Sequence, residues 1–418
     1  MKTLLIYPNM PLQYSLPHSI AQLSSLLKYK GDEVKLFEST LYKKEGEITD
    51  EDLRVKRKQL KSYKIDNNIK KTDLIEDFNK AVEEFEPDRI MISFVDNTVD
   101  IGFKLLNSLK KHIFTIAGGV SVILSRERFK SPLIDAAWNN TASNLLFPWN
   151  PELLLFDDWT IFEEKRLYRP MDGNIYKTIP IITSYNCPYK CGFCAAPELR
   201  KHIKYNKKSI KFVEEEIKFQ IELHKPEFIY FSSESILSRP LSELKDFAEF
   251  YKQYKLPFWC QSHVNTITEN TAKLLQEMGC NRIALGLECG NEKYRKEMIK
   301  KNFSNDQVLK AFKILADYGI KASCNNIIGF PLETKEIIQD TIDMNKKIYN
   351  IMPEVQLNCY IFQPYYGTAL RDICIKNNLL KGEPNTVIGD PVIKNENITK
   401  SELIYIRDNF YDIITEKS

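Results

Sequence analysis

Near the middle of the chain stands the stretch Ile179-Pro180-Ile181-Ile182-Thr183-Ser184-Tyr185-Asn186-Cys187-Pro188-Tyr189-Lys190-Cys191-Gly192-Phe193-Cys194. The apolar run at its start is typical of a buried strand. Cys187, Cys191 and Cys194 follow with CxxxCxxC spacing. Three thiolates on one tight loop can hold three irons of a cubane iron–sulfur cluster, which leaves the fourth iron open to an outside ligand.

Other uses of three cysteines fit this spacing less well. A tetrahedral zinc site needs a fourth Cys or His at a fixed spacing, and His202 lies too far along the chain for a zinc knuckle or finger. Disulfides need an oxidising compartment, and the sequence shows no secretion signal. We therefore expect Cys187, Cys191 and Cys194 to be the metal ligands of a [4Fe–4S] cluster.

Composition describes an ordinary soluble enzyme. The chain has 418 residues, enough for two or three domains, with 43% hydrophobic and 28% charged residues. A net charge of +3 gives no basic field of the kind that nucleic-acid binding needs. No apolar run reaches the ~18 residues of a membrane span. Nine cysteines without an export signal suit a reducing cytoplasm.

Strands alternate with helices in the N-terminal part of the chain, residues 1–147. The expected strands are Thr3–Tyr7, Val34–Phe37, Ile90–Val95 and Ile113–Ala117, and the expected helices are Ser19–Tyr29, Asp73–Phe85 and Val99–Lys111. This rhythm predicts a doubly wound, Rossmann-like parallel sheet. Ligands bind beyond the carboxyl ends of such strands. The residues expected there are Asn9, Ser93, Gly118 and Gly119.

Two segments interrupt this rhythm. Residues 41–73 are highly charged, which predicts a solvated surface insertion. Residues 148–178 are rich in loop formers and predict a linker between domains, with Trp159 and Phe162 as an apolar anchor.

The pattern of strand and helix resumes over residues 179–370, ahead of a C-terminal tail of helices at 371–418. The expected strands are Ile179–Ser184, Phe228–Ser232, Phe258–Gln261, Arg282–Leu287, Lys321–Ile328 and Val355–Phe362. The helices expected between them are Lys211–Leu223, Leu241–Tyr254, Glu269–Met278, Ser304–Tyr318 and Lys335–Tyr349. Active sites of βα barrels lie at the carboxyl ends of the strands.

The cysteine spacing, with the aromatic Phe193 before the last cysteine, resembles the signature of the radical S-adenosylmethionine (SAM) superfamily. The resemblance implies an α/β fold with a partial (β/α)6 barrel. It also implies a [4Fe–4S] cluster that reductively cleaves SAM to a 5′-deoxyadenosyl radical, which abstracts hydrogen from a small-molecule or peptide substrate. An external one-electron donor of the flavodoxin or ferredoxin type is implied as the source of the electron.

The same resemblance implies which residues bind SAM. Each follows a barrel strand, and with Phe193 the expected set is Glu234, Gln261, Glu288, Asn326 and Gly329. Glu234 is expected to accept from the ammonium of SAM as a charge-assisted contact, with a surface loop carboxylate as the alternative. Glu288 lies in an element similar to the family's Gly-x-Glu-x-Gly, which favours the ribose or the ammonium.

Two further residues are candidates for catalysis. His263 stands where the family often has arginine, and it titrates near neutrality when unperturbed. It is either an acid/base or substrate-contact residue or a neutral loop histidine. Cys289 could donate a hydrogen atom to a substrate radical, because an S–H bond is weaker than most C–H bonds. Its alternative role is a small filler in the core.

The N-terminal sheet resembles the cobalamin-binding domain that precedes many radical SAM barrels. The landmarks are Phe37–Lys71, Glu83–Asp88 and Ala117–Val120. No DxHxxG motif supplies a histidine ligand to cobalt, and the acidic turn that usually follows Gly118-Gly119 is missing. Residues 134–140 lead almost at once to Pro148–Pro151, so the domain looks shortened. The sheet either binds cobalamin in an altered pocket or is a vestigial scaffold.

Two enzymatic functions are therefore open. The first is a cobalamin-dependent C-methyltransferase. The alternative is a cobalamin-independent radical SAM epimerase, dehydrogenase or rearrangement enzyme, with Cys289 as hydrogen donor. A non-catalytic redox sensor is a third reading, against which the two SAM-site elements around Glu288 and Gly329 argue. The basic run Arg200–Lys208 is expected to be a solvated segment, or else to recognise an anionic substrate.

Overall fold

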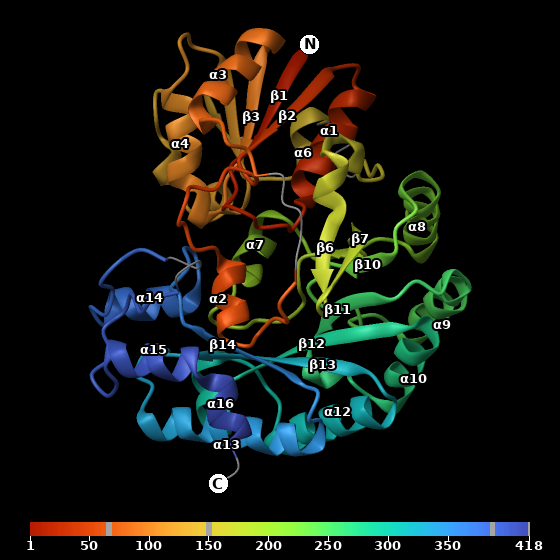
Figure 1. Cartoon of the computed structure of the whole chain (residues 1–418), viewed down its shortest axis with the longest axis vertical. Helices are drawn as coiled ribbons and strands as arrows, with labels where there is room; N and C mark the ends of the chain where they lie inside the picture. The colour runs from red at the N-terminus through yellow and green to blue at the C-terminus, as the bar shows by residue number, and fades with distance from the viewer. Residues whose placement is uncertain (64–68, 148–152, 385–388, 417–418) are drawn as a thin grey trace. The chain divides into compact units, whose positions relative to one another are not determined.

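The chain folds into two compact units, which the computed structural model describes over residues 1–63, 69–147, 153–384 and 389–416 (Figure 1). The N-terminal unit comprises Met1–Leu53, Lys64–Pro170 and Lys201–Ile203. The C-terminal unit comprises Arg54–Tyr63, Met171–Arg200 and Lys204–Ser418. Part of the predicted linker, with the segment Pro148–Pro151, falls on residues 148–152 and so lies outside the described residues. The domain boundaries predicted from sequence stay a prediction.

A five-stranded parallel sheet forms the middle of the N-terminal unit. Its strands are β1 (Lys2–Tyr7), β2 (Glu33–Glu38), β3 (Arg89–Ser93), β4 (Phe114–Gly118) and β5 (Ala136–Ala137), in the order β2-β1-β3-β4-β5. Leu5 of β1 pairs with Leu36 on one side and with Met91 on the other. The strand order reverses between β1 and β3, which is the arrangement of a doubly wound sheet. The predicted fold class of this part is confirmed.

Helices flank this sheet, and two of them begin with a side-chain cap. The flanking helices are α1 (His18–Tyr29), α3 (Leu74–Phe85), α4 (Val99–Asn107), α5 (Val120–Leu124) and α6 (Ala142–Leu146). Asp73, which was expected to be the first residue of α3, is instead its N-cap, and its carboxylate accepts from the backbone of Ile75 and Glu76. Helix α4 ends four residues earlier than expected, where the Ser108 hydroxyl bonds back to the Leu105 carbonyl at 2.8 Å.

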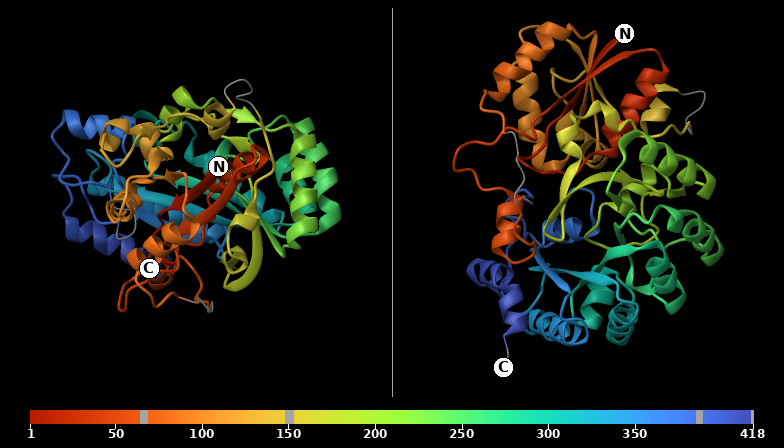
Figure 2. Two further views of the ribbon diagram at one scale, coloured as in Figure 1. Left: turned by 90° about the horizontal axis from the view of Figure 1, so that it is seen from above. Right: turned by 45° about the vertical axis from the view of Figure 1, so that its right-hand side comes forward.

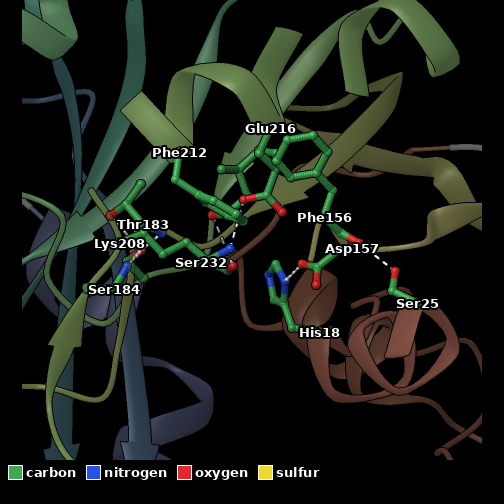
Figure 3. Close-up of polar contacts among 12 residues, drawn as sticks. His18, Ser25, Phe156, Asp157, Thr183, Ser184, Lys208, Phe212, Glu216 and Ser232 are labelled. Carbon is green, nitrogen blue, oxygen red and sulfur yellow. Dashed lines mark hydrogen bonds and ion pairs between the residues drawn. The ribbon is translucent and has the colours of Figure 1, made fainter. Parts of the chain in front are cut away.

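The segment after residue 152 is held against α1 of the same unit. Ser25 Oγ donates to the Phe156 carbonyl, and His18 Nδ1 lies 2.6 Å from Asp157 Oδ2 (Figure 3). Trp159 is 1% exposed and packs its ring edge-on against His18 at 5.1 Å. The apolar anchor expected at this position is therefore part of a packed core.

A curved seven-stranded sheet forms the C-terminal unit, in the order β14-β13-β12-β11-β10-β7-β6. Six strands correspond to the predicted ones: β7 (Asn174–Ile181), β10 (Phe228–Phe231), β11 (Phe258–Ser262), β12 (Cys280–Glu288), β13 (Lys321–Ile328) and β14 (Gln356–Ile361). These six pair in parallel throughout. The edge strand β6 (Tyr168–Met171) was not predicted and lies, with the start of β7, inside the segment expected to be a linker.

The helices that follow the strands are α7 (Ala196–His202), α8 (Ile210–His224), α9 (Leu241–Tyr251), α10 (Glu269–Met278), α11 (Glu292–Tyr294), α12 (Asn305–Asp317) and α13 (Lys335–Ile351). Those labelled α8, α9, α10, α12 and α13 lie along the outer side of the curved sheet (Figures 1 and 2). The chain ends in α14 (Ala369–Lys376), α15 (Lys400–Asp408) and α16 (Phe410–Thr415). A half-barrel of parallel strands with helices outside confirms the predicted α/β fold class. No helix among the described residues is long and apolar enough to cross a membrane.

A charged segment, residues 54–63, crosses the C-terminal unit; we call it the strap. It was expected to be part of a solvated insertion, but Gln59 is 2% exposed and donates to the Cys359 carbonyl of β14 at 2.9 Å. Arg57 is also buried, and its Nε lies 2.8 Å from Asp408 of α15. Helix α2 (Asp50–Lys56) leads into the strap. Residues 64–68 of the predicted insertion lie outside the described residues.

Asp172, in the turn between β6 and β7, binds the other end of the strap. Its carboxylate lies 3.0 Å from Lys61, 3.3 Å from Arg282 and 2.6 Å from Lys321. Partial burial acts to raise the pKa of Asp172, but the hydrogen bonds from Lys321 and Lys61 and the charge of Arg282 outweigh it, so the pKa is below its usual value. One carboxylate therefore ties the strap to the starts of β12 and β13.

Replacing Asp172 by Asn is expected to destabilise the protein by about 1–2 kcal/mol at pH 7, because three cations lose their counter-charge at a partly solvated site. Asp172 has a φ of 52°, which Asn also adopts readily, so the backbone is kept. A carboxyl with a lowered pKa stabilises the fold above its ordinary pKa of 3.8 and loses this effect as the pH falls. Urea unfolding should show a gap between variant and parent at pH 7 that closes in acid. Part of the gap should remain just below pH 3.8, because the folded protein keeps this carboxyl ionised there, and a gap that persists at a pH well below the lowered pKa of Asp172 would contradict the charge argument.

Candidate metal and cofactor centre

Cys187, Cys191 and Cys194 lie on the loop between β8 (Ser184–Tyr185) and α7, and all three are half-buried. The loop is fixed at Gly192, whose N–H donates to the Ile299 carbonyl at 2.8 Å and whose carbonyl accepts from the Leu370 N–H at 3.0 Å. A Cβ at residue 192 would lie 3.3 Å from the Met298 carbonyl oxygen. Glycine therefore allows the loop to pack against two other segments.

Arg200 also holds this loop, and the sequence analysis did not identify it. Its Nη1 donates to the carbonyls of Cys187 and Tyr189, the latter at 2.6 Å. Arg200 begins the basic run that was expected to be solvated or to bind an anion. At the end of the run, Lys208 is buried and paired with Glu216 at 2.8 Å (Figure 3). Both ends of the run therefore have structural partners within the protein, whereas Lys201, Lys204 and Asn206 between them are exposed, as expected for a solvated segment.

The three thiols fit the ligands of an iron–sulfur cluster. Burial raises the pKa of each thiol, to about 11 for Cys194. Iron would bind these groups as thiolates and release their protons. Among the described residues, no three His, Cys, Asp or Glu side chains converge closely enough to hold a single metal ion. The three sulfurs lie on one braced loop, and their role as ligands of a cubane stays a prediction.

Glu234 follows β10 and lies near the three thiols. Its side chain is exposed to water, yet the surrounding protein raises its pKa and its charge raises the pKa of the buried Cys187 and Cys194 further. The adjoining turn is fixed by Ser233, whose Oγ accepts from the Thr183 N–H at 2.7 Å. An accessible carboxylate near the cysteine loop is suited to bind a cation.

His263, after β11, is held in a neutral state. Its ring stacks on Tyr189 with centroids 3.8 Å apart and an angle of 11°, and Nδ1 accepts from the Asn265 N–H at 3.2 Å. Burial, followed by the charge of Lys301, lowers the pKa of His263 to about 3. The pKa of His263 therefore lies below the near-neutral value of a free imidazole, and its placement favours the neutral loop histidine of the two roles that the sequence left open. Gln261 lies half-buried two residues earlier on β11.

Glu288 forms an ion pair that the sequence did not reveal. It is 7% exposed at the end of β12, has a φ of 65°, and lies 3.0 Å from the ammonium of Lys301. Lys301 also donates to the Gly286 carbonyl at 2.7 Å. A Cβ at residue 286 would lie 2.1 Å from Glu288 Oε1 and 2.7 Å from Lys301 Nζ, so Gly286 makes room for the pair.

Cys289 points into an apolar core. Its side chain is fully buried beside Ile299, Phe330 and Leu370, with Phe193 packed against the same cluster. Burial is the main cause that raises the pKa of the Cys289 thiol, to about 12. A thiol without exposed surface is poorly placed to meet a substrate radical. Its placement favours the filler role that the sequence left open.

Asn326 of β13 is also fully enclosed. Its amide exchanges hydrogen bonds with Asn345 of α13 at 3.1 and 2.8 Å, and it is 0% exposed. This reciprocal pair leaves its side chain a structural role, where a SAM contact was expected. Gly329, with a φ of 77°, donates to Glu333 Oε2. Glu333 is buried, and burial raises its pKa to about 8.

The residues predicted to face a ligand on the N-terminal sheet lie together at its carboxyl edge. Asn9, Ser93 and Gly118 come at or after the ends of the neighbouring strands β1, β3 and β4. Asn9 is buried and bonds Thr40 Oγ1 and the Gln13 carbonyl, so it shapes the loop. A Cβ atom at Gly118 would have no neighbour within 4 Å, so the backbone there borders open space. A Cβ atom at Gly119 would lie 2.5 Å from the Phe94 carbonyl oxygen, so a side chain at this position would clash.

Comparison with known proteins agrees with this architecture. Residues 181–344 match the sequence profile described as "Radical SAM superfamily". An uncharacterized methyltransferase of Pyrococcus horikoshii is 26% identical over 373 residues, which cover 78% of this chain and 78% of that protein.

Two solved structures are similar over nearly the whole chain. The first is the cobalamin-dependent S-adenosylmethionine radical enzyme OxsB with aqua-cobalamin and S-adenosylmethionine bound, with a TM-score of 0.66 at 15% identity over 98% of this chain and 67% of that one. The second is the radical S-adenosylmethionine methyltransferase TsrM from Kitasatospora setae with cobalamin and a [4Fe-4S] cluster bound, with a TM-score of 0.63 at 13% identity over 98% and 85%. At these identities the likeness shows the shared fold.

Proposed function

Because residues 181–344 form a domain of the radical SAM superfamily, we propose that this radical SAM enzyme is a cobalamin-dependent C-methyltransferase. The observation that carries the proposal is the combination of two sites in one chain. One is the braced three-cysteine loop of the half-barrel, and the other is the carboxyl edge of a doubly wound sheet ahead of it. The two similar solved structures combine the same two folds, and both of those proteins bind cobalamin.

Several residues of the half-barrel would hold the cluster and SAM. Cys187, Cys191 and Cys194 would bind the iron, and Arg200 would keep their loop in place. A cluster so bound supplies the electron that splits SAM into methionine and a 5′-deoxyadenosyl radical. Glu234 would accept from the SAM ammonium, because its carboxylate is accessible and incompletely solvated. The protein also has to orient SAM and substrate and exclude water.

Glu288, the second carboxylate expected to bind SAM, would make a different contact from that of Glu234. One oxygen of Glu288 is bound to Lys301, so its charge is already balanced. We therefore favour a ribose hydroxyl over the ammonium as its ligand. Gln261, Gly329 and Phe193 stay candidates for the rest of SAM. The substrate is a small molecule or peptide, and the electron comes from an external donor of the flavodoxin or ferredoxin type. The oxygen sensitivity of such clusters suits the cytoplasm.

The N-terminal sheet would hold cobalamin at the loops after β1, β3 and β4. The open space above Gly118 allows a large ligand to approach the backbone there. A cobalamin-independent radical enzyme is the second candidate. It is favoured by β5, which has only two residues and leaves this edge of the sheet short.

Iron and cobalt per chain separate the two candidates. After anaerobic reconstitution with iron, sulfide and hydroxocobalamin, and removal of free cofactor, we expect about four irons and about one cobalt per chain. A protein with four irons and no cobalt would contradict the methyltransferase proposal and leave the N-terminal sheet as a structural scaffold. A Gly118→Phe variant, in which a large side chain fills the open space, should retain iron and lose cobalt.

A further inference from the structure

Lys301 is a buried cation within the candidate centre. It is 6% exposed, and its ammonium bonds Glu288 Oε1 and the Gly286 carbonyl at 3.0 and 2.7 Å. It also lies 5.7 Å from the centroid of the Phe303 ring. Burial is the largest single influence on Lys301 and acts to lower its pKa, but the charge and hydrogen bond of Glu288, together with Cys191 and Cys194, outweigh it, so the pKa is raised. The group therefore keeps its positive charge.

The cysteine loop lies close to this cation. Gly192, between Cys191 and Cys194, donates to the carbonyl of Ile299, two residues before Lys301. The Lys301 ammonium is therefore held on a segment that is hydrogen-bonded to the loop between two of the three candidate ligands.

The backbone holds Lys301 in a fixed position. Residues 295–299 form a π-helical turn, a form that is rare and frequent at functional sites. Arg295 is fully buried within it and donates to the carbonyls of Cys289 and Phe303 at 2.6 and 2.9 Å. The Lys301 N–H donates to the Arg295 carbonyl at 3.1 Å. The backbone at Lys301 is therefore braced, and its ammonium is held by the Glu288 carboxylate and the Gly286 carbonyl.

We propose that Lys301 is a resident cation that eases one-electron reduction of the cluster, with Glu288 as the counter-ion that limits its effect. This inference rests on the proposed cluster at the three cysteines. One electron leaves the external donor, which is oxidised, and enters the cluster, which is reduced. The electron adds a negative charge to a cluster already surrounded by three thiolates. A fixed positive charge nearby stabilises the reduced form more than the oxidised form.

Redox titration of the reconstituted protein without SAM, followed by electron paramagnetic resonance of the reduced cluster, tests the proposal. Lys301→Met should lower the ratio of reduced to oxidised cluster at a given potential about tenfold, the order expected for one charge in a protein interior. This corresponds to about 59 mV for one electron. Glu288→Gln should shift the midpoint potential upward, and Lys301→Arg should leave it near that of the parent.

Two variants isolate the charge from other effects. The double variant Lys301→Met with Glu288→Gln leaves no unpaired carboxylate, and its potential should fall below that of Glu288→Gln alone. Lys300→Gln removes the same charge from the neighbouring exposed residue, where water screens it, so its potential should stay unchanged. Equal potentials for Glu288→Gln and the double variant would overturn the proposal and leave Lys301 a structural partner of Glu288.

The same experiment keeps this failure apart from failure of the proposed cluster. A parent protein with far fewer than about four irons per chain and no signal on reduction would reject the cluster itself. A parent with a full cluster whose potential does not respond to the charge at 301 would reject only the role of Lys301. Circular dichroism of each variant, before reconstitution, shows whether it is folded, and Lys301→Arg provides a folded comparison if Lys301→Met is not.

Discussion

Replacing Glu216 by Gln is expected to lower the free energy of unfolding by about 3–5 kcal/mol, because it leaves the Lys208 ammonium buried without a counter-charge. Lys208 and Glu216 are 2% and 0% exposed, and their side chains meet at 2.8 Å. The ammonium also lies over the ring of Phe212 at 5.2 Å. A carboxamide has nearly the shape of a carboxylate, so the loss reports the charge and not a cavity. Urea unfolding followed by circular dichroism measures it.

Glu215, which directly precedes Glu216 in the same helix, provides a matched control. It carries the same charge, but its partner Lys211 is 4.0 Å away and both side chains are exposed. Glu215→Gln should change the free energy of unfolding by less than about 0.5 kcal/mol. Similar losses for the two variants would mean that the burial of the Lys208–Glu216 pair is not what makes it important.

Replacing Cys194 by Ala is expected to reduce the iron from about four per chain to less than about one and to abolish SAM cleavage. The reason is that a cubane on this loop has only three protein ligands, so two thiolates would leave two irons open to solvent. Iron analysis after anaerobic reconstitution, with 5′-deoxyadenosine formation as the second readout, measures both effects.

Cys280→Ala is the control for this variant. Cys280 begins β12, at the opposite end of that strand from Glu288, and it is not among the proposed ligands. We expect its iron content and SAM cleavage to equal those of the parent. A Cys194→Ala protein that kept a full complement of iron would place the third ligand elsewhere and reject the proposed donor set.

Strong local signals allowed several elements to be predicted to the residue. Helix α10 runs from Glu269 to Met278 as expected, because Thr268 and Thr271 form a capping box at its start and Gly279 ends it in a left-handed conformation. Strand β13 was also predicted with its observed bounds, although only Ile327 and Ile328 at its end are residues that favour strands. In contrast, β6 has four residues including Pro170, too short and too weak a pattern to distinguish it from a loop.

The candidate centre was predictable only in part, because partners distant in sequence decide what a side chain does. The cysteines and Glu288 belong to recognisable elements of sequence. Arg200 and Lys301 do not, since their roles depend on carbonyls and carboxylates that only the fold brings to them. Asn326 shows the opposite case, because the pairing with Asn345 that encloses its amide cannot be predicted from its position near the end of strand β13.

The strap has a consequence for the order in which the chain can fold during synthesis. Arg57 and its partner Asp408 are 351 residues apart, so at about 5–20 residues per second the strap leaves the ribosome tens of seconds before its partner exists. All five strands of the N-terminal sheet have been synthesised once residue 137 is made, so this sheet can form before the rest of the chain exists. The half-barrel must wait for its last helices, so a nascent chain halted before α15 carries a finished first sheet and a strap whose charged side chains are open to chaperones and proteases.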